Sequence, residues 1–317
     1  MSTGAGPSVS VIVPTYNRRR TLGRALDSVG TQTWPAREVI VVDDGSRDGT
    51  AEWLPEAHPD VRLIPLTRNL GAAHARNVAM REATGDIIAF LDSDDWWEPG
   101  FLQESVAALQ RAPEAVMAVS DVHMMLLYED APSQYVYRCR PVHGYRDMVE
   151  HLLLHNFITT MSCVAVRRPA VEAVGLLDET LRVVHDKEWY IRLSTRGGVA
   201  CTEQPLVWRN IDKDNLVADL DRFLADNKRF WSLFFTKPPG AGYRDLRWRV
   251  RSKTYEGFAA MALGRGSRLA SCRYNLMGFM YSCYDMHPEL RLLRRAGEGF
   301  HAALRAAASK ALRRRKR

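Results

Sequence analysis

Long apolar runs, paired cysteines and glycine-rich phosphate loops are all missing from this sequence of 317 residues. No apolar run approaches the ~20 residues that a membrane-spanning helix needs. Residues 1–10 lack the basic start and apolar stretch of a secretory leader. The five cysteines are odd in number and form no Cys-x-x-Cys pair, which argues against a disulfide framework or a zinc site. We therefore expect buried, reduced thiols in a cytoplasmic protein.

The motifs GxxxxGK[ST] and GxGxxG are also absent, so no glycine-rich helix start is available to hold phosphates. A nucleotide diphosphate would need another partner. The net charge of +7 is uneven: residues 290–317 carry ten Lys and Arg and one Glu. The other 289 residues carry 34 basic and 36 acidic side chains, which argues against nucleic acid as the main partner.

Short apolar, β-branched segments alternate with helix-length segments over the first 120 residues. The expected strands are residues 9–14, 38–42, 61–66 and 86–91. Because such strands are apolar throughout and separated by helices, they predict an α/β fold with a mostly parallel sheet covered on both faces.

The second half of the chain is less regular. Further strands are expected at residues 158–166 and 199–208, and a helix at 188–195. From residue 243 onward the chain is expected to be helical, with breaks at 264–266 and 287–288. We therefore predict a catalytic domain over residues 1–235 and a helical C-terminal region with a basic tail over 236–317.

Polar clusters follow three of the predicted strands, at residues 15–18, 43–46 and 92–95. In parallel sheets ligands bind at the carboxyl ends of the strands, so these clusters predict a binding crevice. Asp92 and Asp94 have the spacing to hold Mg²⁺ or Mn²⁺ together with phosphate oxygens. The alternative is an acidic turn that caps the following helix.

Two further clusters each allow two interpretations. In residues 39–50, VIVVDDGSRDGT, Asp44 either accepts a hydrogen bond from a nucleobase or belongs to a turn in which Ser46 or Asp48 caps the next helix. In residues 68–77, RNLGAAHARN, Arg76 is either a solvated helix residue or the charge partner of a pyrophosphate.

Taken together, these motifs resemble the family 2 glycosyltransferases of the GT-A fold, a Rossmann-like architecture. The resemblance is strong over residues 9–97 and looser to about residue 210, through SCVAVRRPAVEAVGLLDE and HDKEWYIRL. It implies an inverting enzyme that uses a divalent metal and a nucleotide-sugar. UDP is the expected nucleotide, with dTDP and GDP left open.

The resemblance also implies roles for particular residues. It places Asp44 against the base, Arg76 against the nucleotide, Asp92 and Ser93 beside the ribose or metal, and Asp94 on the metal. The role of Asp95 is left open. The end of the first strand is expected to meet the base and ribose through four residues: Pro14, Thr15, Tyr16 and Asn17.

Asp186 corresponds to the general base that removes the acceptor proton, although His185 stands where the family often has Glu. The alternatives are that Asp186 only caps its helix, or that His185 is the base. The acceptor pocket is expected around residues 156–162 and 208–215. The QxxRW motif of processive synthases is absent, which favours transfer of a single sugar.

The predicted partners are a nucleotide-sugar donor and a glycan or lipid-linked acceptor, with no nucleic acid. In the tail, an apolar stripe at helical spacing favours either an anionic membrane surface or packing on the catalytic domain. Its residues are Leu293, Ala296, Phe300, Leu304 and Ala307. Competing functions are a catalytically inactive nucleotide-sugar-binding scaffold and a sugar-phosphate nucleotidyltransferase. The latter requires a Gly-rich, Arg-containing loop after the first strand, where PTYNRRR stands instead.

Overall fold

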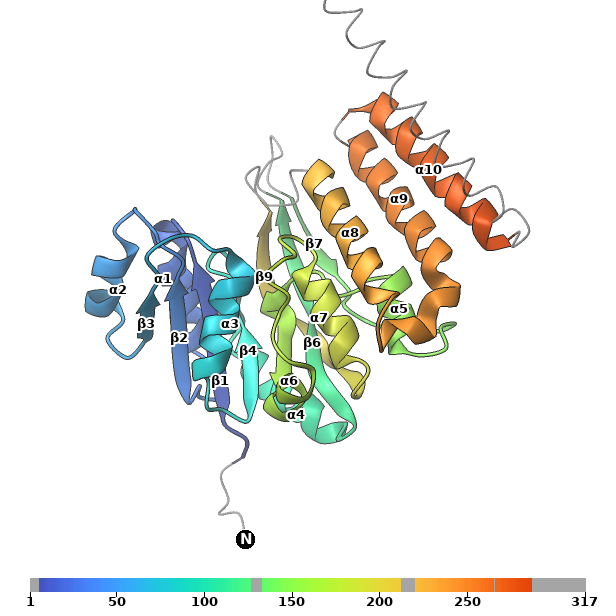
Figure 1. Cartoon of the computed structure of the whole chain (residues 1–317). Helices are drawn as coiled ribbons and strands as arrows, with labels where there is room; N and C mark the ends of the chain where they lie inside the picture. Colours follow the sequence, from blue (N-terminus) through green and yellow to red (C-terminus); the bar gives the residue numbers. More distant parts are fainter. Residues whose placement is uncertain (1–5, 127–132, 212–219, 265, 287–317) are drawn as a thin grey trace, which may run out of the picture. The chain divides into compact units, whose positions relative to one another are not determined.

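The computed structural model describes residues 6–126, 133–211, 220–264 and 266–286 (Figure 1). They fall into two compact units that divide between Ala241 and Gly242. The division expected from the sequence, between residues 235 and 236, lies a few residues earlier. That residues 1–235 form the catalytic domain stays a prediction.

The first unit is built on one mixed sheet whose parallel half comes from the start of the chain. Its four parallel strands, in spatial order, are β3 (Arg62–Pro65), β2 (Glu38–Asp43), β1 (Val9–Thr15) and β4 (Ile87–Phe90). Every residue of β1 and β4 is buried, as expected for strands covered on both faces. All four strands predicted for the first 120 residues are thus present, each within a residue or two of its expected ends.

The rest of the sheet is mixed. Beyond β4 follow β8 (Val164–Arg167), antiparallel to both neighbours, then β6 (Ala115–Leu126), β9 (Gly198–Ile211) and β5 (Trp96–Trp97). β7 (Ser133–Tyr137) pairs with the end of β6. The strand expected at residues 158–166 is partly wrong. Met161–Cys163 form a 3₁₀ turn because the Thr160 hydroxyl accepts a bond from the Ser162 amide at 3.2 Å.

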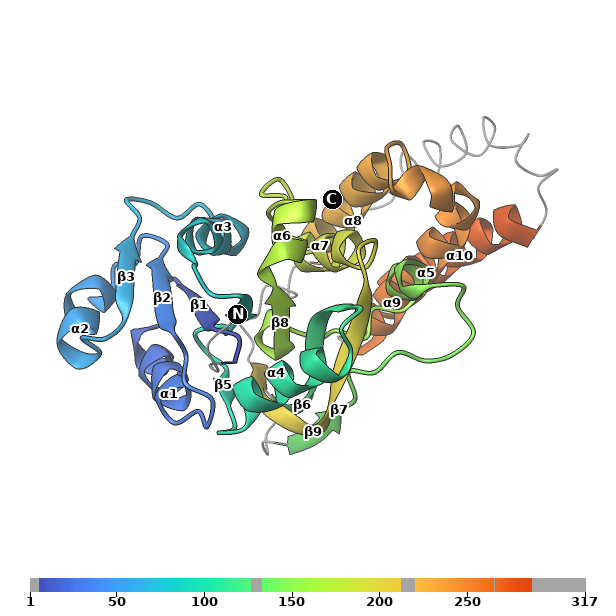
Figure 2. The same cartoon turned by 90° about the horizontal axis from the view of Figure 1, so that it is seen from below.

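Helices cover both faces of the sheet. In Figure 2, α3 (Ala72–Glu82), α6 (Arg168–Val174) and α7 (His185–Leu193) lie on one face, and α1 (Arg19–Gly30) and α4 (Phe101–Arg111) on the other. The other helices of this unit are α2 (Thr50–Ala57), α5 (Met148–Leu154) and α8 (Leu220–Phe234). The helix expected at 188–195 starts three residues earlier, at His185. The predicted α/β fold with a mostly parallel sheet flanked by helices is confirmed.

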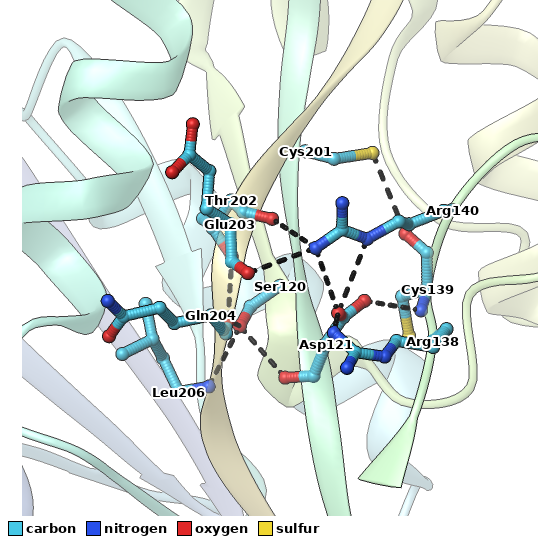
Figure 3. A network of polar contacts seen from close by, with 10 residues as sticks. All are labelled: Ser120, Asp121, Arg138, Cys139, Arg140, Cys201, Thr202, Glu203, Gln204 and Leu206. Carbon is cyan, nitrogen blue, oxygen red and sulfur yellow. Dashed lines mark hydrogen bonds and ion pairs between the residues drawn. The ribbon is translucent and has the colours of Figure 1, made fainter.

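A bulge in β9 sets the position of its second half. Between Val119 and Asp121 the strand β6 advances two residues, while β9 advances four, from Cys201 to Pro205. The buried Asp121 carboxylate accepts bonds from Arg138, Arg140 and the Cys139 amide, as Figure 3 shows. Arg140 also donates to the carbonyls of Thr202 and Glu203 in the bulge. Two backbone carbonyls that the bulge frees from the ladder are therefore satisfied locally.

The second unit consists of η3 (Gly240–Leu246, which crosses the division), α9 (Arg247–Gly264) and α10 (Arg268–Met286). The expected helices and the break near residues 264–266 are present, and Gly266 has a φ of 74°. The break at 287–288 and the basic tail lie outside the described residues. Within the described part of the chain, no helix is long and apolar enough to span a bilayer.

The cysteines differ in part from the expectation of buried thiols. Cys139 and Cys163 are buried and Cys201 is half-buried, but Cys272 is exposed on α10, so burial was wrong for that residue. All four are free thiols. The side chain of Cys283 is not described.

Candidate active site

A cavity of about 450 Å³ opens at the carboxyl ends of β1, β2 and β4. The polar clusters that follow these strands meet there, as the sheet topology requires. Of the ten site residues expected from the sequence, Asn17 and Asp186 are not among those that line the cavity. The eight that line it are Pro14, Thr15, Tyr16, Asp44, Arg76, Asp92, Ser93 and Asp94.

Asn17 connects two loops beside the cavity. Its backbone is left-handed, with a φ of 52°, a conformation that Asn tolerates better than most residues. The Asn17 amide donates to the Ser46 hydroxyl at 2.8 Å, and its side-chain oxygen accepts from the Arg47 amide at 2.8 Å. Its observed contacts therefore hold the loop after β1 against the loop after β2.

Asp44 is buried at the end of β2 and holds the start of α3. Its two carboxylate oxygens accept bonds from the backbone amides of Leu70, at 2.8 Å, and Gly71, at 2.7 Å. An ionised carboxylate has about four lone-pair sites, so two amides leave capacity for a nucleobase N–H. Both roles considered for this cluster therefore fit side by side: Asp44 lines the cavity, while Asp48 accepts from the Thr50 amide at the start of α2.

Arg76 is a buried cation on α3 that joins two segments far apart in the sequence. Its Nη2 pairs with Asp92 Oδ1, and its Nη1 lies 3.0 Å from His185 Nε2. Because a guanidinium only donates, His185 Nε2 must accept, which places the proton of a neutral ring on Nδ1. Among the described residues, neither His185 Nδ1 nor Arg76 Nε has a hydrogen-bond partner. Burial, reinforced by Arg76, lowers the pKa of His185 despite the nearby Asp186.

Asp92 and Asp94 present carboxylates to the cavity, with side chains 29% and 20% exposed. Burial alone would raise the pKa of Asp92, but the Arg76 guanidinium, together with Arg209 and the Thr160 hydroxyl, holds that pKa below its usual value. Asp94 Oδ2 lies 3.6 Å from Arg18 Nη2. The Asp94 carbonyl also accepts a bond from Asn210 Nδ2 at 2.6 Å, which ties this segment to β9.

Asp95 is buried and is not among the residues that line the cavity. Its carboxylate accepts bonds from the Ser162 hydroxyl at 2.6 Å and the Asn210 amide at 3.1 Å. Burial, together with Asp92 and Asp94, raises its pKa well above the ordinary value. The residue whose role the sequence left open therefore anchors the end of β4 to the 3₁₀ turn Met161–Cys163 and to β9.

The donor set fits a divalent cation that is shared with a ligand. Within the described residues, no cluster of three or more His, Cys, Asp or Glu side chains could hold a metal ion by itself. Mg²⁺ is usually held by one or two carboxylates plus substrate phosphates. Asp92 and Asp94, both lining the cavity, provide two such carboxylates.

Asp186 lies in the first turn of α7, one residue after the histidine that contacts Arg76. It is half-buried, and its Oδ1 accepts a bond from the Lys187 amide at 2.6 Å. Lys187 Nζ donates to the Leu153 carbonyl at 3.3 Å, and burial lowers the pKa of Lys187 to about 8 against the opposing effect of Asp186.

Several lining residues were missed by the sequence reasoning. Glu179 accepts bonds from Asn77 Nδ2 at 2.8 Å, and Asn77 also exchanges two bonds with the Leu177 backbone. Asn77 and Glu179 stood in quoted motifs, so their polar character was the available signal. The sequence around Arg182 and Arg222 carried no signal for a place in the site. Both residues reach the cavity only because the later part of the chain packs beside the parallel strands. The polar lining residues to which the sequence gave no role are Arg18, Asn69, Glu179, Arg182 and Arg222.

The two segments expected to form an acceptor pocket lie against each other. Arg209 Nη1 donates to the Thr159 carbonyl at 2.7 Å. Ser162 and Asn210 bind Asp95, so part of both segments supports the end of β4. Residues 212–215 lie outside the described residues, and the acceptor role of these segments stays a prediction.

The chain belongs to glycosyl transferase family 2, whose family model matches residues 10–175. It is 29% identical over 185 residues to an uncharacterized glycosyltransferase of Haemophilus influenzae, covering 58% of this chain and 61% of that protein. It is 31% identical over 177 residues to the amylovoran biosynthesis glycosyltransferase AmsB of Erwinia amylovora, covering 52% and 57%. The chain thus spans less than two thirds of either relative.

Solved structures show the same fold. The chain is similar to TarS of S. aureus in complex with UDP-GlcNAc, with a TM-score of 0.61 and 18% identity over 80% of this chain and 73% of that one. It is also similar to the mannosyltransferase PcManGT of Pyrobaculum calidifontis in complex with GDP-Man and Mn²⁺. That match has a TM-score of 0.56 and 21% identity, over 90% and 88% of the two chains. The expected family and its GT-A fold are confirmed.

Proposed function

We propose that this chain transfers a single sugar, with inversion, from a nucleotide-sugar to a hydroxyl group of a glycan or lipid-linked acceptor. The observation that carries the proposal is the cavity where Asp44, Arg76 and the Asp92–Asp94 segment meet. UDP is the nucleotide we expect first, since TarS was solved with UDP-GlcNAc, and GDP is the alternative that PcManGT suggests. The Erwinia relative supports an acceptor in polysaccharide biosynthesis.

Asp92 and Asp94 would hold Mn²⁺ or Mg²⁺ beside the donor. When bound, such a cation neutralises charge on the departing diphosphate. Arg76 adds a fixed positive charge from within the protein, since its contacts to Asp92 and His185 hold the guanidinium at the cavity wall. Asp44 would accept a bond from the base while it holds the loop before α3 through the Leu70 and Gly71 amides.

Asp186 would remove the proton of the acceptor hydroxyl. Direct displacement needs a base on the face opposite the leaving nucleotide, within hydrogen-bond reach of the acceptor. His185, the alternative base, uses its Nε2 to accept from Arg76, and burial lowers its pKa. These contacts support Asp186 as the base and His185 as a residue that positions Arg76.

Calorimetric titration with UDP, GDP and dTDP, each with and without Mn²⁺, tests donor binding. We expect one nucleotide to bind in a metal-dependent way and Asp94→Asn to lose that dependence. Asp27→Asn is the matched control, because Asp27 is exposed on α1 and does not line the cavity. Failure of all three nucleotides to bind under any condition would contradict the proposal.

Asp186→Asn tests the base. We expect donor binding within about twofold of wild type and transfer lowered by the 10²–10⁴-fold that general base catalysis contributes. Transfer is measured as release of nucleoside diphosphate once the nucleotide is known. If wild type binds the donor but releases no diphosphate with any glycan or lipid-linked acceptor, the inactive scaffold becomes the better interpretation.

A further inference from the structure

Helix α10 has two apolar faces, and among the described residues only one of them is packed. On the packed face, Tyr274 contacts Tyr255 and Phe258 of α9, with ring centroids 6.2 and 5.6 Å apart. On the same face, the Ser252 hydroxyl donates to the Gly278 carbonyl at 2.9 Å. These contacts hold α9 and α10 together as a hairpin. They do not involve the opposite face of α10.

That opposite face carries a stripe of exposed apolar side chains. Leu269 is 85% exposed, Leu276 52% and Phe279 65%, and Cys272 between them is also exposed. At 3.6 residues per turn, these four positions share one side of the helix. We call them the α10 stripe. Exposed apolar side chains that gather on one face mark a surface for a partner or a membrane, whereas single scattered ones need no explanation.

Basic residues flank the α10 stripe. Arg268 and Arg273 are both exposed, and helical geometry places them on opposite sides of it. An apolar stripe with cationic borders is the pattern of a helix that lies in a membrane interface. The apolar residues enter the boundary between headgroups and acyl chains, while the cations remain at the level of the lipid phosphates.

The charge of the whole chain is concentrated in the same part of the sequence. Residues 242–317 carry 18 of the 44 Lys and Arg but only five of the 37 Asp and Glu. Residues 1–241 carry 26 basic and 32 acidic side chains. The C-terminal region is therefore strongly cationic and the rest of the chain is anionic. Each Lys or Arg near an anionic leaflet adds electrostatic attraction to it.

We propose that α10 docks on an anionic lipid bilayer, with Leu269, Leu276 and Phe279 in the interface and Arg268 and Arg273 on lipid phosphates. Charge favours this occupant over the two others. A second copy would bring an equally cationic region against the stripe. Residues 287–317 of the same chain, with ten Lys and Arg against two Glu, would also be repelled.

Vesicle co-sedimentation of the full chain tests the proposal, with one set of vesicles containing phosphatidylglycerol and another of phosphatidylcholine alone. We expect at least tenfold stronger partitioning to the anionic vesicles, weakening as salt is raised. The double variant Leu269→Ser/Phe279→Ser should lower that partitioning about tenfold or more, because two apolar side chains no longer enter the interface. Leu233→Ser is the matched control, since Leu233 is an exposed leucine of the first unit.

Three results would overturn the proposal. The first is that wild type does not bind anionic vesicles. The second is that the double variant binds them as well as wild type, which would assign binding to the basic tail alone. The third is a dimer in sedimentation velocity without lipid that the double variant dissolves, which would assign the stripe to a second copy. An unchanged helical circular dichroism signal and thermal midpoint show that the variant is folded, and a failure of wild type to bind any nucleotide bears only on the proposed enzymatic function.

Discussion

Replacing His185 with leucine removes the acceptor of Arg76 Nη1 and leaves the ring's volume nearly filled. A hydrogen bond to a charged group contributes about 1.5–3 kcal/mol, and a buried guanidinium N–H without its acceptor loses that contribution. The substitution also removes the buried, unpartnered Nδ1–H of His185, which offsets part of this loss of stability. We therefore expect the free energy of unfolding to fall by about 1–2 kcal/mol, measured by urea denaturation.

The same substitution should weaken binding of a ligand that depends on Arg76. If Arg76 serves the diphosphate, UDP affinity should fall about 5–30-fold, the equivalent of 1–2 kcal/mol. Uridine, which lacks the diphosphate, should bind His185→Leu as it binds wild type. His185→Gln is the matched control, because its side-chain oxygen can accept from Arg76 Nη1 and should restore most of the UDP affinity.

Calorimetry of the three proteins with both ligands separates this reasoning from a general disturbance of the fold. Equal weakening of UDP and uridine would mean that the cavity itself has changed. An unchanged UDP affinity in His185→Leu, with the loss of stability present, would show that His185 stabilises the fold without positioning Arg76 for the diphosphate. Either result refutes the assigned role.

Three further predictions concern titration and the loop before α3. Burial lowers the pKa of both His185 and His151, so the unfolded chain takes up protons below pH ~6.5 before the folded one does. The free energy of unfolding should therefore fall as pH drops below ~6.5, by up to ~1.4 kcal/mol per pH unit for each histidine. In His185→Gln the denaturation midpoint should depend less steeply on pH than in wild type. Lys187 has its pKa lowered to about 8, so its burial costs stability at every pH below that value. Lys187→Met should raise the free energy of unfolding at pH 7 by up to ~3 kcal/mol, and the gain should vanish as pH rises toward 10.5. Asp44→Asn weakens the bonds from the Leu70 and Gly71 amides and should speed hydrogen exchange at these two amides, whereas Asp48→Asn should leave them unchanged.

Most of the parallel half of the fold could be predicted, because each strand there is a continuous buried run that periodicity detects. The strand predicted over residues 158–166 was partly wrong for a specific reason. The segment is apolar enough for a strand, but Thr160 and Ser162 turn toward Asp95 and form a 3₁₀ turn before β8 begins. A partner more than 60 residues away therefore overrode the local preference.

Eight of the ten expected site residues line one cavity, because parallel strands bring their carboxyl ends to one edge of the sheet. The residues that were missed depend on long-range packing. Arg182 is placed by Asp226 of α8, whose carboxylate accepts bonds from the Arg182 and Val183 amides at 2.6 Å. No periodicity or spacing relates positions 44 residues apart on a loop and a helix, so tertiary structure was needed to find them.

The charges of the cavity explain why donor and metal should bind together. The lining carries four arginines and four acidic residues, namely Arg18, Arg76, Arg182 and Arg222 against Asp44, Asp92, Asp94 and Glu179. Four of these charges already form two pairs across the site, Arg76 with Asp92 and Arg18 with Asp94. A diphosphate alone would compete with the carboxylates for the arginines, and a cation alone would compete with the arginines for the carboxylates. When both bind, the diphosphate faces the arginines and the cation faces the carboxylates, so each paired side chain keeps a partner of opposite charge. Nucleotide affinity should therefore rise with metal concentration, and metal affinity should rise with nucleotide concentration by the same factor.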